Sequence, residues 1–201
     1  RGLMKVKLFF LTLSAVILTY LIYNANHHQE IKISAIYDEK TTIKENFNTY
    51  LKPNLEKLLP TTYYTFSSEN LEIENVIDKI KSNYKDIQQE LNNSNVVIVY
   101  LGDFEILYEK ESITNIYTDL ENLFIVLRKY NSKQIIYLSP INLSTNYILK
   151  DLARKYKIDF LNTPNILEKT GQKNYILDTK DYEILSNKLY NKIISTWKIN
   201  T

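Results

Sequence analysis

The sequence predicts an α/β domain, with a parallel sheet between two layers of helices, that is preceded by one hydrophobic segment. From residue 31 onward, short apolar runs alternate five times with longer amphipathic stretches, which is typical of β-α units joined by right-handed crossovers. The run 95–101 (NVVIVYL) is apolar without alternation, as expected of a central parallel strand that is covered on both faces. No repeat or low-complexity linker interrupts residues 31–201, so we expect one domain there.

The hydrophobic segment runs from Leu8 to Tyr23 (LFFLTLSAVILTYLIY) and carries no charge. At ~1.5 Å of helix rise per residue it can cross most of a ~30 Å hydrocarbon core. Lys5 and Lys7 precede it, and positive flanks stay on the cytoplasmic side of a membrane. We therefore expect residues 1–7 in the cytoplasm, a transmembrane signal-anchor over residues 8–23, a linker over 24–30 and an extracytoplasmic domain over 31–201, in a single-pass protein of the cell membrane.

A cleaved secretory signal is the alternative interpretation of this segment. Cleavage requires small residues at positions −3 and −1. The nearest match places Ala25 at −1 but the bulky Tyr23 at −3. The sequence therefore favours an anchor that is retained.

Five strands are expected from residue 31 onward. Residues 31–36 (IKISAI) are the first apolar run, and residues 61–66 (TTYYTF) are β-branched and aromatic. After the central run 95–101, residues 134–138 (QIIYL) form a strand that stops before Pro140, and residues 158–161 (IDFL) form a short fifth strand.

Five helices are expected between and after these strands. Residues 43–59 form a helix that ends before Pro60, and residues 71–91 carry one apolar stripe that continues to Leu91. Residues 113–130, 147–156 and 181–197 are amphipathic in the same way. The alternation predicts a flavodoxin-like strand order, 2-1-3-4-5, with any site beyond the carboxyl ends of strands one and three.

The composition excludes several classes of function. A net charge of +2 gives no clustered basic face for nucleic acid, so no nucleic-acid partner is expected. The absence of cysteine excludes disulfides, thiolate metal sites and cysteine nucleophiles, and no motif calls for a cofactor. Only Gly102 and Gly171 lie in the folded part, which counts against a tightly shaped catalytic site.

Acidic residues follow the expected strands at one edge of the sheet. Asp38 and Glu39 follow strand one, Asp103 follows strand three, and Asp178 and Asp181 precede the last helix. If the fold is as expected, these groups converge on one rim. Helix capping is the alternative explanation for Asp38 and Asp181, because acidic side chains near a helix N-terminus are worth ~0.3–1 kcal/mol each.

The blocks around these residues resemble the SGNH (GDSL) hydrolase superfamily of α/β esterases and lipases, over residues 31–197. The segment IKISAIYDEKTT stands where the family has a strand followed by Gly-Asp-Ser, and NSNVVIVYLGDFEIL stands where it has Gly-x-Asn-Asp. The segments LFIVLRKYNSKQIIYLSPINL and DLARKYKIDFLNTPNIL resemble its fourth and fifth strands with their helices. LDTKDYEILSNKLYNKII stands where it has Asp-x-x-His before the closing helix. The resemblance implies a serine-dependent acyl hydrolase.

The chain departs from the family at the residues that carry the reaction. Glu39 occupies the position of the nucleophilic serine, and Asp181 occupies that of the histidine, while Asp178 matches the third member of the triad. In the oxyanion-hole block, Tyr100 replaces the glycine and Gly102 the asparagine. Only Asp103 of that block is retained, and Ser67 or Ser68 lies near the family's second oxyanion position.

Acyl transfer needs a hydroxyl beside a base that takes its proton, and donors aimed at the developing oxyanion. The only histidines, His27 and His28, belong to the linker after the hydrophobic segment. We therefore expect a catalytically inactive, membrane-anchored domain that binds an envelope glycan or an acylated ligand, as an accessory module of the cell envelope.

Two other functions stay open at this stage. One is a divergent but active esterase, acting on envelope polysaccharide or lipid esters, with Ser34, Thr41 or Thr42 as nucleophile. The other is a divalent-cation site built from Asp38, Glu39 and Asp103, since carboxylates at strand ends suit Mg²⁺ or Ca²⁺. The segment IYDEKTTIKENFNTYL also resembles the start of a response-regulator receiver domain, which implies such a site.

Overall fold

The computed structural model describes residues 30–38, 47–68, 71–103, 106, 112–131, 133–143, 146–170 and 175–197, together with residues 14 and 16–18. The chain divides into two compact units, Arg1–Glu30 and Ile31–Thr201. In the first unit, residues 14 and 16–18 are helical and exposed. Most of the expected anchor over residues 8–23 lies outside the described residues, and within them no helix has the length and apolar character needed to cross a bilayer.

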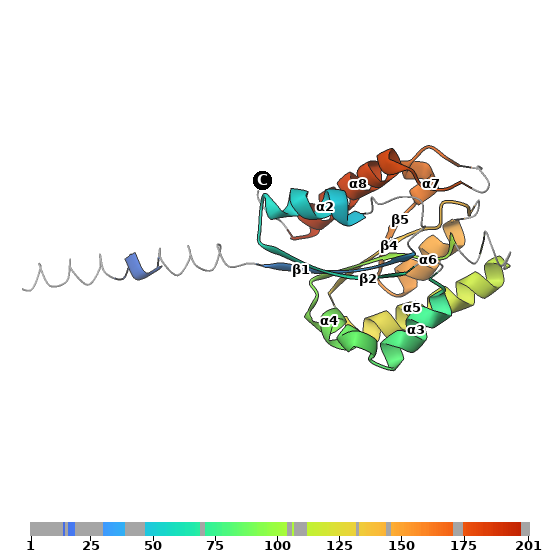
Figure 1. Cartoon of the computed structure of the whole chain (residues 1–201), viewed down its shortest axis with the longest axis horizontal. Coiled ribbons are helices and arrows are strands. Elements are labelled where there is room, and N and C mark those ends of the chain that lie inside the picture. Colours follow the sequence, from blue (N-terminus) through green and yellow to red (C-terminus); the bar gives the residue numbers. More distant parts are fainter. Residues whose placement is uncertain are drawn as a thin grey trace, which may run out of the picture. The chain divides into compact units, whose positions relative to one another are not determined.

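The second unit is built on a five-stranded parallel sheet in the order β2-β1-β3-β4-β5, as predicted (Figure 1). Its strands are β1 (Ile31–Asp38), β2 (Thr61–Ser68), β3 (Val96–Tyr100), β4 (Gln134–Leu138) and β5 (Asp159–Leu161). Every residue of β3 and β4 is buried, as is expected where helices cover both faces of a parallel sheet. The edge strand β2 is mostly half-buried.

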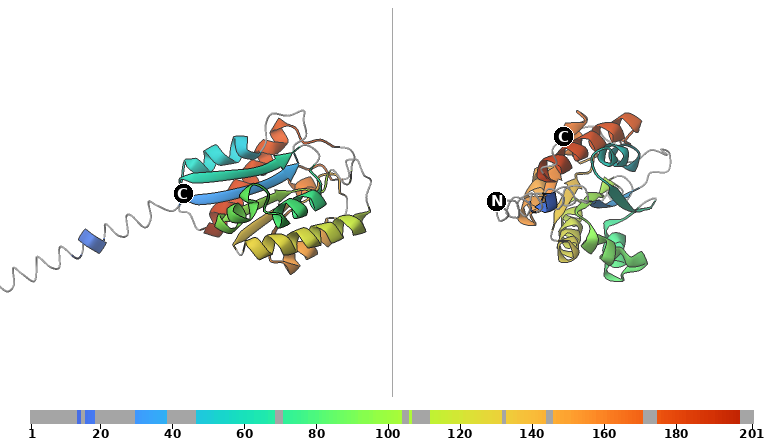
Figure 2. Two further views of the ribbon diagram at one scale, coloured as in Figure 1. Left: turned by 60° about the horizontal axis from the view of Figure 1, so that its bottom comes forward. Right: turned by 90° about the vertical axis from the view of Figure 1, so that its left-hand side faces the viewer.

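Helices cover the two faces of the sheet in separate sets (Figures 1 and 2). On one face lie α2 (Phe47–Glu56) and α8 (Thr179–Trp197), which pack against each other. On the other lie α3 (Ile73–Lys81), α4 (Ile87–Asn93), α5 (Ile113–Tyr130) and α6 (Tyr147–Lys155). A short helix, α7 (Thr163–Ile166), follows β5 and was not predicted from the sequence.

Each face of the sheet has its own hydrophobic core. In the core beneath α2 and α8, the fully buried Phe47 ring meets Tyr37, Tyr100 and Tyr182 edge-to-face, with ring centroids 5.8, 5.7 and 5.2 Å apart. Edge-to-face aromatic pairs contribute ~0.5–1.5 kcal/mol each beyond the area they bury. These rings lie next to the carboxyl ends of β1 and β3, so this core closes the region where a site was expected.

The expected single helix over residues 71–91 is wrong. The chain there forms α3, then the 3₁₀ turn η1 (Tyr84–Asp86), then α4. Asn83, Lys85 and Asp86 have φ near +55° (+54°, +50° and +58°), and left-handed residues cannot continue a right-handed helix. The apolar stripe is nevertheless continuous, because both halves bury their isoleucines in the same core.

The first and last helices differ from expectation only at their ends. Of the expected 43–59 helix, the structure describes residues 47–59, and α2 ends at Glu56, three residues before the expected end. The helix carries Pro53 in its interior, which has no N–H to donate. Helix α8 begins at Thr179, two residues before the expected start, because Asp178 is its N-cap.

Candidate functional site

Asp38 ends β1 at the rim where a site was predicted. It is buried, and its Oδ1 accepts a hydrogen bond from the Leu71 backbone N–H at 3.0 Å. In the parallel register it stands opposite Ser68 of β2. Asp38 therefore fastens the end of the first strand to the segment that leads into α3. Its neighbour Glu39, and the alternative nucleophiles Thr41 and Thr42, lie outside the described residues.

Asp103 is held at the end of β3 by a turn that only glycine fits. Gly102 has φ +109°, and a Cβ at that position would lie 2.8 Å from the Pro140 ring. The turn carries Asp103 into the protein, where it is 3% exposed. A side chain at position 102 would force Pro140 or the turn to move, so the burial of Asp103 depends on this glycine.

Asp103 accepts four hydrogen bonds from the groups around it. The Tyr100 hydroxyl donates to Oδ2 in a short contact, and the Ile141 N–H donates to the same oxygen at 3.2 Å. Asn142 donates to Oδ1 through its backbone N–H at 3.2 Å and through Nδ2 at 3.0 Å. Both carboxylate oxygens are thus bound to the protein, as burial of a charge requires.

Asp178 and Asp181 form a capping box at the start of α8. The Asp181 backbone N–H donates to Asp178 Oδ1 at 2.9 Å, and the Asp178 N–H donates to Asp181 Oδ2 at 3.1 Å. The Tyr175 hydroxyl donates to the same Oδ2 at 2.6 Å. The capping explanation therefore holds for Asp181.

Asp38 and Asp103 line one small cavity at the rim, together with three tyrosines, Tyr100, Tyr175 and Tyr182, and the apolar Leu101, Ile141 and Leu177. The cavity measures about 10 Å³, which is room for about one water molecule. Asn142 holds Tyr175 there, since its Oδ1 accepts from the Tyr175 N–H at 2.7 Å and its Nδ2 donates to the Tyr175 carbonyl at 3.0 Å. Among the described residues, side chains leave little open space between the ends of β1 and β3.

The pKa values of two of these tyrosines are raised. Burial, and then the neighbouring Asp103 carboxylate, raise the pKa of Tyr100 well above its ordinary value. The hydrogen bond to Asp181, and then burial, raise the pKa of Tyr175. Both phenols therefore keep their protons at neutral pH and serve as hydrogen-bond donors to carboxylates, not as bases.

Ser34 lies four residues before the end of β1, in the interior of the sheet. It is 1% exposed, and its hydroxyl shares a 2.7 Å hydrogen bond with the hydroxyl of Ser94. At ~3.3 Å per residue it stands ~13 Å from the strand end. Its hydroxyl is a structural group in the core.

The cation-site hypothesis named Asp38, Glu39 and Asp103. Of these, Asp38 and Asp103 line the same cavity, while Glu39 lies outside the described residues. Within the part of the chain that the structure describes, no three histidine, cysteine or acidic residues are grouped so that they could hold a metal ion.

Comparison with protein-family models finds no match, and comparison with curated protein sequences finds none either. Solved structures do match. A family 3 carbohydrate esterase from Clostridium thermocellum superposes with a TM-score of 0.61 at 14% identity, over 84% of this chain and 99% of that one. An acetyl xylan esterase, AlAXEase, gives 0.59 at 12% identity, over 82% and 100%. AlinE4, an SGNH-hydrolase family esterase, gives 0.54 at 15% identity, over 84% and 97%.

The domain has the SGNH-hydrolase fold. The resemblance seen in the order of the sequence blocks is thus confirmed as a likeness of fold. The sequence pointed to the acidic residues at the rim but missed Asn142, Tyr175 and Tyr182. Asn142 follows the Ser-Pro end of β4, and only its three-dimensional neighbours distinguish it from an ordinary loop asparagine.

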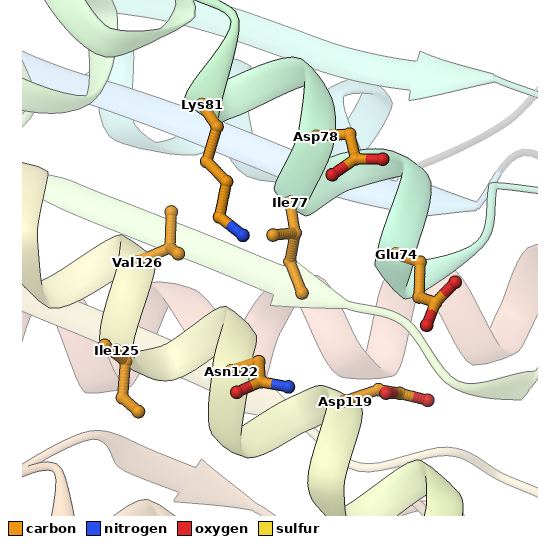
Figure 3. Close-up of a pocket in the computed structure, with 8 residues that line it drawn as sticks. All are labelled: Glu74, Ile77, Asp78, Lys81, Asp119, Asn122, Ile125 and Val126. Atoms are coloured by element: carbon orange, nitrogen blue, oxygen red, sulfur yellow. The ribbon is translucent and has the colours of Figure 1, made fainter.

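A larger hollow, of about 420 Å³, lies between α3 and α5 (Figure 3). Glu74 and Asp78 of α3 and Asp119 of α5 project at its edge, above a floor that includes Ile77 and Val126. Burial, and then the Glu74 carboxylate, raise the pKa of Asp119. None of the acidic residues at the strand ends lines this hollow.

Proposed function

We propose that this protein is a catalytically inactive domain of SGNH-hydrolase fold, held on the outer side of the cell membrane by residues 8–23, where it acts as a binding or accessory module of the cell envelope. The observation that carries the proposal is the capping box of α8. Asp181 stands where the family has its histidine, and both its backbone N–H and its carboxylate are engaged in starting that helix.

We expect no hydrolysis because the domain lacks a base for proton transfer. A hydroxyl becomes a nucleophile when a neighbouring base takes its proton, and the base works best when its pKa lies near the operating pH. No histidine occurs in residues 31–201, so the domain has no imidazole for this task. The raised pKa values of Tyr100 and Tyr175 keep both phenols protonated near neutral pH, so neither provides a phenolate base there.

The closed rim supports the same conclusion. A cavity of about 10 Å³ admits one water but neither an acyl chain nor a sugar ring. The four donors around Asp103 all point at its carboxylate, so none of them is free to stabilise a developing oxyanion. We therefore place ligand binding elsewhere on the domain.

The anchor rests on the uncharged run of residues 8–23 and on the lysines that precede it. Membrane fractionation tests it. We expect the full chain to stay in the membrane pellet after alkaline extraction, with its domain open to external protease in spheroplasts. Replacing both Val16 and Ile17 by lysine adds ~2.5–3.5 kcal/mol per residue to insertion and should release the chain. Extraction of the unchanged chain would refute the anchor.

Catalytic inactivity is tested by turnover of p-nitrophenyl acetate and p-nitrophenyl butyrate with the full chain in detergent. We expect rates equal to those of detergent buffer and of the heat-denatured protein. Turnover well above both, abolished by replacing one serine or threonine with alanine, would establish the divergent esterase instead.

A further inference from the structure

A groove of about 320 Å³ lies where the start of α6 meets the end of β5 and α7. It shares no lining residue with the cavity beside Asp38 and Asp103. The lining residues that matter are Asn146, Tyr147, Lys150, Phe160, Asn162 and Thr170. With this volume it can hold a ligand the size of one or two sugar rings, which the rim cavity cannot.

Two aromatic rings line the groove. Tyr147 is 66% exposed, an unusual position for a large aromatic residue at the start of a helix. Phe160 is half-buried, and its ring lies 6.2 Å from that of Tyr137 in the core, which fixes it in place. An exposed ring beside a fixed one provides a flat apolar surface for a ligand that also carries polar groups.

Neutral polar side chains make up much of the remaining wall. Asn146, Asn162 and Thr170 each carry both a donor and an acceptor, as pairs of hydroxyl groups require. Lys150 is the charged residue among the described lining, and no carboxylate stands with it. This wall suits a neutral or anionic ligand rich in hydroxyl groups and disfavours a cation.

Asn146 has an acceptor that its own chain leaves unused. The residue is 7% exposed, and its Nδ2 donates to the Leu143 carbonyl at 3.2 Å and to Asn162 Oδ1 at 3.3 Å. Its Oδ1 is buried without a hydrogen-bond partner. An unpaired buried acceptor is destabilising, and a turn of the Asn146 amide toward the groove would let a ligand hydroxyl supply the missing donor.

We propose that this groove binds an oligosaccharide, with a sugar ring stacked on Tyr147 and its hydroxyls paired to Asn146 and its neighbours. The inference rests on the proposed function, because it supplies the binding surface that a non-hydrolytic envelope module needs. A flat apolar face edged by hydroxyls is the chemistry of a pyranose, and aromatic stacking with amide hydrogen bonds matches it. The described lining of the groove holds no carboxylate, whereas Glu74, Asp78 and Asp119 line the hollow of Figure 3.

The test is calorimetric titration of the full chain in detergent with four probes: cellotetraose, xylotetraose, tetra-N-acetylchitotetraose and tetragalacturonic acid. We expect at least one to bind, and Tyr147→Ala to weaken its affinity about tenfold or more, because the substitution removes the ring on which the sugar stacks. Tyr147→Phe keeps the ring and should bind within a few-fold of the unchanged chain.

Tyr84→Ala is the matched control, because Tyr84 is another exposed tyrosine, 45% accessible, on η1. It should leave the affinity unchanged. Failure of all four probes to bind, or equal affinity of Tyr147→Ala, would overturn the inference. Either result leaves the ester-turnover assay untouched, so the two proposals fail separately.

Discussion

The carboxyl groups of Asp103 and Asp181, at the rim of the sheet, each accept several hydrogen bonds from the protein itself. Such a carboxyl group holds the fold together and does not transfer protons. Asp103 binds Tyr100, Ile141 and Asn142, and Asp181 binds Tyr175 and the Asp178 N–H. A buried carboxyl group that accepts several hydrogen bonds contributes to folding when its partners are in place. At the scale of single residues, Asp103 and Asp181 therefore have structural roles.

Replacing Asp103 with alanine should cost stability. It would leave the Ile141 and Asn142 N–H groups and the Tyr100 hydroxyl without an acceptor, at a cost of about 3–5 kcal/mol. Urea unfolding followed by circular dichroism measures this change. Asp151→Ala is the control, since Asp151 pairs only with Arg154 on the surface and should change stability by no more than ~0.5 kcal/mol. Equal effects of the two substitutions would contradict the role of Asp103.

Introducing a histidine at position 181 should not by itself produce ester hydrolysis. Asp181→His removes the carboxylate of the capping box and the acceptor of Tyr175, and should destabilise the fold by about 1–2 kcal/mol. Thermal unfolding and ester turnover of the same preparation measure both effects. Appearance of hydrolysis in this single variant would show that a competent nucleophile already stands beside position 181.

At the scale of elements, one arginine joins α5 to the loops at the amino ends of β4 and β5. Arg128 donates to the carbonyls of Tyr156 at 2.9 Å, Asn131 at 3.3 Å and Lys133 at 2.7 Å, and also to that of Lys157. Burial lowers the pKa of Arg128, but the guanidinium stays charged throughout the ordinary pH range. The fork of five donors is what allows one side chain to reach several carbonyls.

Arg128→Lys should therefore be almost as damaging as Arg128→Ala. A lysine keeps the charge but offers no planar fork, and we expect both variants to lose about 2–4 kcal/mol of the free energy of unfolding. Chemical denaturation tests this, with Arg154→Ala as the control because Arg154 is exposed. A lysine variant as stable as the unchanged chain would show that charge, not geometry, is what matters.

The hollow between α3 and α5 gives a prediction for pH. Burial and Glu74 raise the pKa of Asp119 above its unfolded value of 3.8, so folding favours its protonated form. Ionised Asp119 therefore destabilises the fold above its folded pKa, and this penalty disappears as pH falls below 3.8. Asp119→Asn should raise the melting temperature at pH 7 and lose that advantage near pH 3.

Glu74→Gln provides the control for this effect. The Glu74→Gln substitution removes one of the two causes that raise the pKa of Asp119. In this background, Asp119→Asn should therefore raise the melting temperature at pH 7 by less than it does in the unchanged chain. Melting temperatures at pH 3, 5 and 7 decide the matter. If the gain in melting temperature from Asp119→Asn were larger at pH 3 than at pH 7, the predicted pKa shift of Asp119 would be contradicted.

The sequence predicted the strands and their order because each strand is a local apolar run, and the alternation with helices restricts the topology to few choices. It did not predict the break between α3 and α4, because the isoleucine stripe continues through it. The left-handed conformations of Lys85 and Asp86 leave no mark in composition.

The acidic candidates of the site were visible from their positions after the strands, but the closure of the rim was not. Asn142 and Tyr175 meet across 33 residues, and Asp103 and Asn142 across 39. Such pairings depend on how distant loops fold over the sheet, and no local pattern encodes them. The capping box, by contrast, is a local motif and was available from the spacing of Asp178 and Asp181.

At the scale of the whole molecule, an SGNH-hydrolase fold is combined with a chain that has no histidine in residues 31–201. Fold and chemistry separate readily, since function depends on a few side chains grafted onto a stable framework. Here the sheet order and the helix layers are kept, while the strand ends are filled by aromatic rings. The proposed binding groove lies apart from these strand ends, between the start of α6, the end of β5 and α7.

The most direct test of this account is covalent labelling of the full chain with a fluorophosphonate probe, followed by intact mass measurement. The probe reacts with hydroxyls that a neighbouring base activates. We predict no adduct beyond that found on the heat-denatured protein, with AlinE4 esterase labelled in parallel as the positive control. A stoichiometric adduct on one serine or threonine of this chain would contradict the claim that it has lost acyl-transfer chemistry.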